Sequence, residues 1–274
     1  MAFTSNGAHR IHWQSEGDGT PVLLIMGHQY SSRMWYPVIP ALAPRHRVLS
    51  FDNRGTGESG AGTGFTIADM ARDALAVMDA AGVDRAHVYG VSMGGGIAQE
   101  LAVLAPDRVL SLVLGCTAIQ SAEKPRLPGV ARALYFIPKP LWRALMRRGD
   151  GYGSRTTPER RAEADGVLAG EVTVTSSIAA QAKAVATYMA DKDDVARMTM
   201  PALVMHADED SVVPYAYGVE LADTLPNSRM VTFEGAAHNF IVANPELANS
   251  EVLEFLDEVD ARKYPAAPPV NLGP

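Results

Sequence analysis

One serine of this chain lies in a sequence pattern that prepares a hydroxyl group for nucleophilic attack. Ser92 is the centre of Gly90-Val91-Ser92-Met93-Gly94, a G-x-S-x-G pattern. An apolar, partly β-branched run (86–91) precedes it, and apolar residues at helical spacing follow it (97–104). Between a strand and a helix, small flanking residues permit a turn so tight that the serine Oγ is held clear of the backbone. We therefore predict that Ser92 is a nucleophile.

A base and an orienting carboxylate are expected on two later loops. A serine hydroxyl is a weak nucleophile at neutral pH, so it needs a base, and the base needs a group that orients it. His238 lies in a loop rich in small residues (234–240), and the loop 207–214 carries Asp208, Glu209 and Asp210. Each loop follows a predicted strand, so each should emerge at the same sheet edge as Ser92. The pattern alone leaves the choice among the three carboxylates open.

Alternating strand and helix patterns predict the sheet that brings these loops together. Apolar runs predict strands at 11–14, 22–26, 47–51, 86–91, 109–114, 201–207 and 229–234. Helical spacing predicts helices at 34–42, 66–81, 97–104, 215–225 and 245–261, with Thr66 as an N-cap and Asp69 three residues on. This alternation is typical of an α/β fold with a mostly parallel central sheet flanked by helices.

One segment interrupts the alternation. Between about 117 and 199 the β-type runs thin out, proline and charge increase, and residues 128–148, 158–169 and 176–198 have mostly helical character. We interpret residues 117–199 as a helical cap inserted over the carboxyl edge of the sheet, with residues 1–116 and 200–264 as the core. Residues 265–274 are rich in proline, and we expect them to be disordered.

Composition excludes several classes of function. The chain has 274 residues, 47% hydrophobic residues and a formal net charge of -7, without an extended basic run, so nucleic acid and anionic membranes are poor partners. No apolar stretch approaches the roughly 20 residues that span a bilayer. One cysteine, Cys116, allows no internal disulfide or CxxC motif, and the histidines are scattered, so we expect neither a metal nor a cofactor. The first residues lack a signal-peptide pattern, and we expect a cytoplasmic protein.

The quoted motifs resemble those of the α/β-hydrolase-fold serine hydrolases, and the resemblance extends from about Val22 to Leu256. The similar motifs are Gly90-Val91-Ser92-Met93-Gly94-Gly95, Asp52-Asn53-Arg54-Gly55-Thr56-Gly57-Glu58-Ser59, His206-Ala207-Asp208-Glu209-Asp210-Ser211-Val212-Val213-Pro214 and Gly235-Ala236-Ala237-His238. The resemblance implies that Asp210, four residues before Pro214, is the acid of a Ser92–His238–Asp210 triad. Asp208 then shapes its turn. Ala207 departs from the glycine that is common in the family, which puts little in doubt.

The resemblance also implies an oxyanion hole, which needs two backbone N–H groups. One is expected from Met93, after the nucleophile, and the other from His28, in the loop that follows the strand 22–26. Two roles for the His28 imidazole remain open: a contact with the substrate, or a hydrogen bond to backbone or water.

The activity implied by the resemblance is hydrolysis of a small carboxylic ester or lactone through an acyl-enzyme, as in carboxylesterases and enol-lactonases. Alternatives on the same fold are a C–C bond hydrolase, a lyase, a cofactor-free haloperoxidase and a non-catalytic protein that binds a small ligand. A serine at position 92 argues against haloalkane dehalogenases and epoxide hydrolases. The expected partner is a small-molecule substrate, and a homodimer stays open as the oligomeric state.

Other polar residues are expected to be structural. We interpret Asp52 and Arg54 as members of a loop held by side-chain hydrogen bonds. His206 is expected to be structural as well, and Cys116 to pack near the cap. Asp73 and Asp79 are expected on the surface of a helix.

Overall fold

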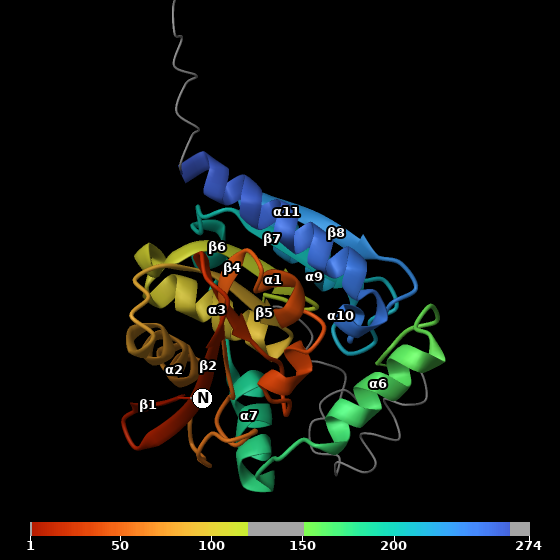
Figure 1. Ribbon diagram of the computed structural model, residues 1–274. Coiled ribbons are helices and arrows are strands. Elements are labelled where there is room, and N and C mark those ends of the chain that lie inside the picture. The colour runs from red at the N-terminus through yellow and green to blue at the C-terminus, as the bar shows by residue number, and fades with distance from the viewer. Residues whose placement is uncertain (1, 120–150, 264–274) are drawn as a thin grey trace, which may run out of the picture.

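Eight strands form one sheet in the computed structural model, which describes residues 2–119 and 151–263. The strands are β1 (Ala2–Asn6), β2 (His9–Glu16), β3 (Thr20–Ile25), β4 (His46–Phe51), β5 (Ala86–Val91), β6 (Val109–Gly115), β7 (Ala202–Ala207) and β8 (Ser228–Phe233). Their order is β1-β2-β4-β3-β5-β6-β7-β8 (Figure 1). β2 pairs antiparallel with both β1 and β4, and every pair from β4 to β8 is parallel. The predicted α/β architecture with a mostly parallel sheet is confirmed.

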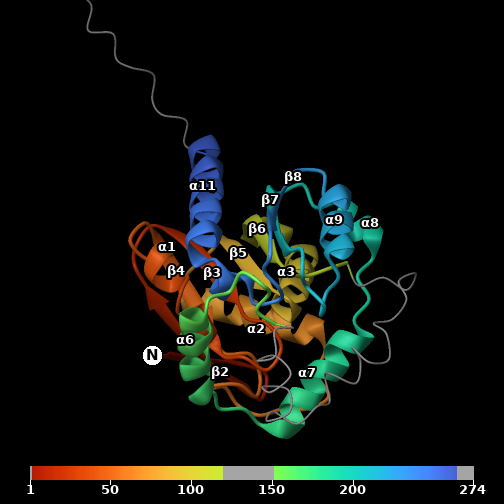
Figure 2. The same ribbon diagram turned by 90° about the vertical axis from the view of Figure 1, so that its right-hand side faces the viewer.

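Helices cover both faces of the sheet, as predicted. Alternate residues of a strand point to opposite faces. Along β3, Leu23 and Ile25 join the apolar core beneath α2 (Ile67–Ala80), α3 (Met93–Leu104) and α9 (Tyr215–Thr224). Val22 and Leu24 join the core beneath α1 (Ile39–Leu42) and α11 (Pro245–Lys263). Figure 2 shows these two sets of helices on opposite sides of the strands.

Short-range chemistry sets several element boundaries. The Thr66 hydroxyl accepts the Asp69 N–H and the Asp69 carboxylate accepts the Thr66 N–H, a capping box that starts α2 where the sequence predicts it. The helix expected over 34–42 is two short pieces, the 3₁₀ turn η1 (Ser32–Trp35) and α1. Pro37 and Pro40 fall in this stretch, and proline cannot continue a helical hydrogen-bond ladder.

The segment between β6 and β7 contributes helices and no strand of the sheet in its described part, 151–199. These are α6 (Pro158–Ala169), α7 (Thr175–Thr187) and α8 (Lys192–Ala196). The helical character expected over 176–198 is observed as two helices: Tyr188 is extended, and the Asp191 side chain caps a new helix by accepting the Asp193 N–H. Figures 1 and 2 show α6 and α7 at the lower side of the molecule.

Some predictions fall outside the described residues. These are the helix at 128–148, part of the cap 117–199, and the tail 265–274, so the boundaries of core and cap remain predictions. Three short elements were not anticipated: β1, the 3₁₀ turn η2 (Pro106–Arg108) and α10 (Phe240–Ala243). No helix in residues 2–119 and 151–263 has both the length and the apolar character needed to cross a bilayer.

Candidate active site

Ser92 occupies a strained turn between β5 and α3. Its φ of 57° and ψ of -121° are unusual for a residue that carries a side chain, and its N–H donates to the Gly115 carbonyl at 2.8 Å. A Cβ added to Gly90 would collide with the Gly94 carbonyl, and one added to Gly94 would collide with the Ile25 carbonyl. The glycines around Ser92 are therefore required by the close approach of backbone segments.

Ser92, His238 and Asp210 lie in one hydrogen-bonded chain. His238 Nε2 is 2.9 Å from Ser92 Oγ, and His238 Nδ1 is 2.8 Å from Asp210 Oδ2. Ser92 follows β5, Asp210 follows β7 and His238 follows β8, so the carboxyl ends of three parallel strands bring them together. The carboxylate can hold the ring with Nδ1 protonated, which leaves Nε2 free to accept the serine proton.

The structure distinguishes the three neighbouring carboxylates that the sequence left open. Asp210 is buried and accepts the N–H groups of Val212 and Val213 with Oδ1, at 2.8 and 2.9 Å. Asp208 accepts the Gly235 N–H, the turn-shaping role expected of it, and the exposed Glu209 bonds to Ser154. Burial by itself would raise the pKa of Asp210, but His238, the Val213 N–H and His206 together lower it. Asp210 thus has the charge and the position of an orienting group.

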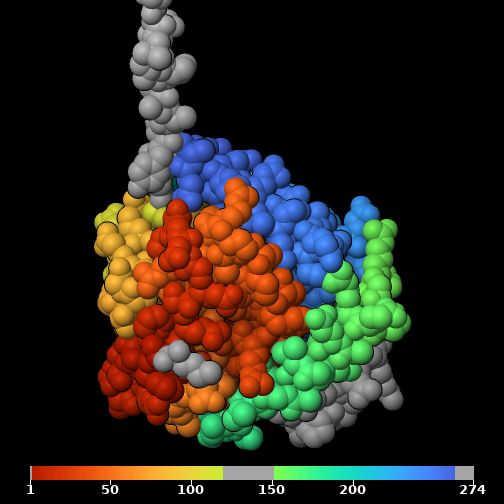
Figure 3. Space-filling view, viewed as in Figure 1, coloured from red at the N-terminus to blue at the C-terminus, as the bar shows by residue number. Residues whose placement is uncertain are grey.

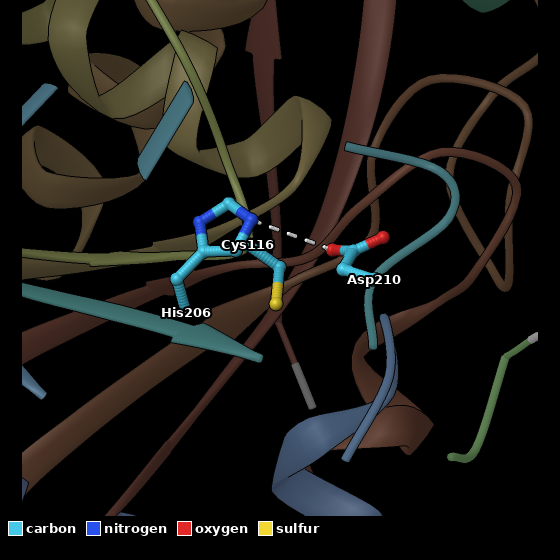
Figure 4. A group of neighbouring side chains, drawn as sticks. All are labelled: Cys116, His206 and Asp210. Carbon is cyan, nitrogen blue, oxygen red and sulfur yellow. Dashed lines mark ion pairs between the residues drawn. The ribbon is translucent and has the colours of Figure 1, made fainter. Parts of the chain in front are cut away.

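Cys116 and His206 lie beside the Asp210 carboxylate (Figure 4). The Cys116 sulfur lies within 4.8 Å of it, and His206 Nε2 lies 3.7 Å from Oδ2 while donating to the Val213 carbonyl at 2.9 Å. Burial and then the nearby Asp210 charge raise the pKa of the thiol, and burial lowers the pKa of His206. Both groups are therefore neutral near pH 7.

The Cys116, His206 and Asp210 side chains are also of the types that can bind a metal ion, and their potential ligand atoms lie within 4.8 Å of one another. The described residues contain no other such group of three. All three residues are buried. Since His206 donates to the Val213 carbonyl and Asp210 accepts from His238 and two backbone N–H groups, we interpret the group as a structural support of Asp210. His206 is structural, in agreement with the sequence interpretation.

The two residues expected to form the oxyanion hole lie near Ser92, one next to it in sequence and one in the same pocket. Met93 is the first residue of α3, and His28 lies in the loop after β3 and lines the same pocket as Ser92 and His238. The His28 imidazole donates from Nε2 to the Ile178 carbonyl of α7 at 3.1 Å. Burial lowers the pKa of His28 to about 4, an effect that this carbonyl partly offsets. Of the two roles left open by the sequence, the backbone hydrogen bond is the one observed.

A pocket that is partly open to solvent adjoins the Ser92–His238 pair. Its walls are mostly apolar, and its polar lining comes from few side chains, among them Gln29, Tyr30 and Asn239. The apolar lining residues are Met26, Met34, Val91, Val212 and Ile241. A mostly apolar lining with a few polar groups suits a small molecule with one reacting polar group.

Residues outside the expected site also shape it. Asp52 accepts the Ser32 N–H and hydroxyl, both at 2.8 Å, and the Glu58 N–H at 2.9 Å, so the predicted side-chain bonding of its loop is observed. The interpretation of Asp73 as a surface charge is wrong: it is 2% exposed and binds Arg54 through two hydrogen bonds. Sequence reasoning missed Gln181 of α7, whose side chain accepts the N–H of Gln29, the residue after His28. A glutamine in a helix carries no local signal that indicates its partners.

Comparisons with known proteins agree with this fold. A family model described as the alpha/beta hydrolase fold matches residues 20–245. A protein of Azorhizobium caulinodans, provisionally named carbamate hydrolase RutD, is 32% identical over 95% of this chain and 100% of its own. A protein of Mycobacterium tuberculosis, provisionally named non-heme bromoperoxidase BpoC, is 31% identical over 92% of this chain and 99% of its own. A solved thermophilic esterase from Thermogutta terrifontis is 25% identical, with a TM-score of 0.83 over 93% of this chain and 97% of its own.

Proposed function

The chain belongs to the alpha/beta hydrolase fold family, and we propose that it is a serine hydrolase that cleaves a small carboxylic ester or lactone. The observation that carries the proposal is the hydrogen-bonded chain from Ser92 Oγ through His238 to the buried Asp210. Ser92 and His238, two members of this hydrogen-bonded chain, line a largely apolar pocket. The similar esterase of known structure supports the same class of reaction.

In the proposed acylation step, Ser92 Oγ attacks the carbonyl carbon while His238 Nε2 takes the hydroxyl proton. The carbonyl electron pair moves onto the oxygen, which the N–H groups of Met93 and His28 stabilise. When the tetrahedral intermediate collapses, the C–O bond to the alcohol breaks and His238 returns the proton to the leaving oxygen. Asp210 keeps the ring oriented and stabilises the imidazolium that forms between the two steps.

Deacylation repeats this sequence with water. His238 removes a proton from a water molecule, the water oxygen attacks the acyl carbon, and Ser92 Oγ leaves with the proton from His238. A lactone follows the same course, except that its alcohol stays joined to the acyl group. A carbamate would acylate Ser92 in the same way, and the relatives named carbamate hydrolase make it the second substrate class to test.

The test combines covalent labelling with turnover. A fluorophosphonate probe should attach to Ser92 as fluoride leaves, and peptide mapping should find the label there. p-Nitrophenyl esters of increasing chain length, a γ-lactone and an aryl carbamate should then rank the substrates. Ser92→Ala and His238→Ala should lose both labelling and turnover, whereas Ser250→Ala, at an exposed serine, should keep both.

Two results would contradict the proposal. Turnover retained by Ser92→Ala would show that Ser92 is not the nucleophile. A folded wild-type protein that neither labels nor turns over any substrate, but binds small ligands tightly, would favour the non-catalytic alternative.

A further inference from the structure

The loop that carries His28 is held from the cap. The Ser31 N–H and hydroxyl donate to Glu171, which lies between α6 and α7, and His28 Nε2 donates to the Ile178 carbonyl. The third contact is the Gln29 N–H, which donates to the side chain of Gln181. These cap residues are 140 to 152 positions away in sequence. Figure 3 shows the cap atoms, in green and teal, packed against the N-terminal part of the chain.

Gln181 is the best-defined of these contacts. It is completely buried, its Oε1 accepts the Gln29 N–H at 2.9 Å, and its Nε2 donates to the Arg54 carbonyl at 2.8 Å. A backbone N–H can only donate and a carbonyl can only accept, so these partners fix the orientation of the amide. A fully buried side chain with both polar ends bonded to backbone is costly to replace, since any apolar substitute leaves two backbone groups unpaired.

The backbone conformation of Gln29 requires stabilisation by contacts from outside its own loop. Its φ of 62° lies in the left-handed region, which a residue with a side chain rarely adopts unless the surrounding structure imposes it. The Gln29 N–H belongs to the peptide plane that follows His28. A hydrogen bond to that N–H therefore fixes the orientation of the backbone directly after the expected oxyanion donor.

We propose that Gln181 is a positioning residue for the oxyanion hole, so that the His28 N–H points at the substrate only while α7 of the cap is seated. This inference rests on the proposed function, because it assigns an effect on a hole that the proposed reaction uses. In this proposal the cap does not only cover the pocket. Gln181, a residue of the cap, also fixes the orientation of the His28 N–H, a donor that belongs to the core.

Ser177 provides a matched control on the same helix. It is also completely buried in α7, one turn earlier, and its Oγ accepts the Gly62 N–H at 2.9 Å. It thus fastens the cap helix to the core as Gln181 does, but it bonds to a loop other than 27–31. A loss of function caused by a loosened cap should appear in both variants, and a loss caused by a misplaced His28 N–H should appear in Gln181 variants alone.

The experiment compares Gln181→Met, Gln181→Asn and Ser177→Ala in the full chain. Asparagine keeps an amide but is too short for both partners, so it serves if the methionine variant does not fold. For each folded variant, kcat and KM are measured with the best p-nitrophenyl ester. Inhibition constants are measured for the trifluoromethyl ketone of the same acyl chain, which forms an oxyanion on Ser92, and for the corresponding alcohol, which does not.

We expect Gln181 variants to lose about 10- to 100-fold in kcat, less than the 10²–10³ for complete removal of a donor. Affinity for the trifluoromethyl ketone should fall by a similar factor, with KM and alcohol affinity within about threefold. Ser177→Ala should keep all four values. The inference is wrong if folded Gln181 variants keep kcat and ketone affinity, or if Ser177→Ala loses as much. A wild-type protein without turnover or ketone binding would instead reject the proposed function.

Discussion

His238 Nδ1 and Asp210 Oδ2 lie 2.8 Å apart, while the second oxygen of the carboxylate is occupied by two backbone N–H groups. The backbone of its own turn therefore fixes the orientation of the Asp210 carboxylate through one oxygen, and the other oxygen orients His238. An amide at position 210 could still accept the backbone N–H groups through its oxygen. It would then turn an NH₂ group toward His238 and favour the wrong tautomer.

We therefore expect Asp210→Asn to fold and to lose about 10⁴-fold in kcat. Asp208→Asn is the control, because Asp208 holds the Gly235 N–H and does not bond to the His238 ring. It should keep kcat within about tenfold. Steady-state kinetics and thermal unfolding of both variants measure this, and equal losses in kcat would remove the special role of Asp210.

Stability should fall as the pH is lowered below about 6.5, the ordinary pKa of histidine. Burial lowers the pKa of His28 to about 4 and also lowers the pKa values of His46 and His206. Between the unfolded and folded pKa values the unfolded chain binds a proton that the folded chain does not, so acid favours unfolding. Lowered pKa values of Asp210 and Asp260 act in the same direction at lower pH.

Urea unfolding at pH 7 and pH 5 tests this pH dependence. The free energy of unfolding should be smaller at pH 5, and His46→Phe should reduce the difference between the two pH values. His46 lies away from the catalytic loops, at the first residue of β4, so this variant separates stability from catalysis. An unchanged difference in the variant would exclude a contribution from His46.

The thiol of Cys116 should be inert in the folded protein. It is completely buried, and its raised pKa keeps it protonated, whereas the thiolate is the reactive form. Ellman's reagent at pH 8 should therefore release almost no chromophore from the native chain and one equivalent in 6 M guanidinium chloride, since the chain has one cysteine. Rapid reaction of the native protein would contradict the observed burial.

The buried Arg54–Asp73 pair should matter far more for stability than a surface pair on the same helix. Asp73→Ala leaves the Arg54 guanidinium, 4% exposed, without its partner, and removal of one partner of a buried pair costs about 3–5 kcal/mol. Asp79, which pairs with Arg108 and is largely exposed, should cost about 0–1 kcal/mol when replaced by alanine. Denaturant unfolding compares the two, and similar costs would be inconsistent with the described burial.

The parts of the fold that the sequence predicts are those set by neighbouring residues. The capping box of Thr66 and Asp69 and the glycines around Ser92 need only local chemistry, and apolar runs marked all strands from β2 to β8. The family resemblance then selected Asp210 among three carboxylates, and the positions of Ser92, Asp210 and His238 in the structure are consistent with that choice.

The rest depended on contacts between distant residues. Asp73 lies on the buried face of α2, three residues after Met70 and four before Val77, but nothing near it in the sequence indicates Arg54 as its partner. Gln181 meets Gln29 across 152 positions, and nothing near either residue indicates the pair. β1 was missed because its residues are half-exposed or exposed and only Ala2 and Phe3 are apolar, so it lacks the apolar run that predicts a buried strand.

The attachment of the cap between two strands also bears on how this protein can diversify. Residues 151–199 lie between β6 and β7 in the chain and add no strand to the sheet, so exchanging this segment between relatives should leave the strands that precede Ser92, Asp210 and His238 unchanged. The segment is nevertheless not independent of the core, because the Gln29 N–H and the Arg54 carbonyl both bond to the side-chain amide of Gln181. A chimaera in which another protein's segment replaces residues 151–199 must supply an equivalent amide. Otherwise the Gln29 N–H and the Arg54 carbonyl lose their hydrogen-bond partner, although Ser92 itself is unchanged.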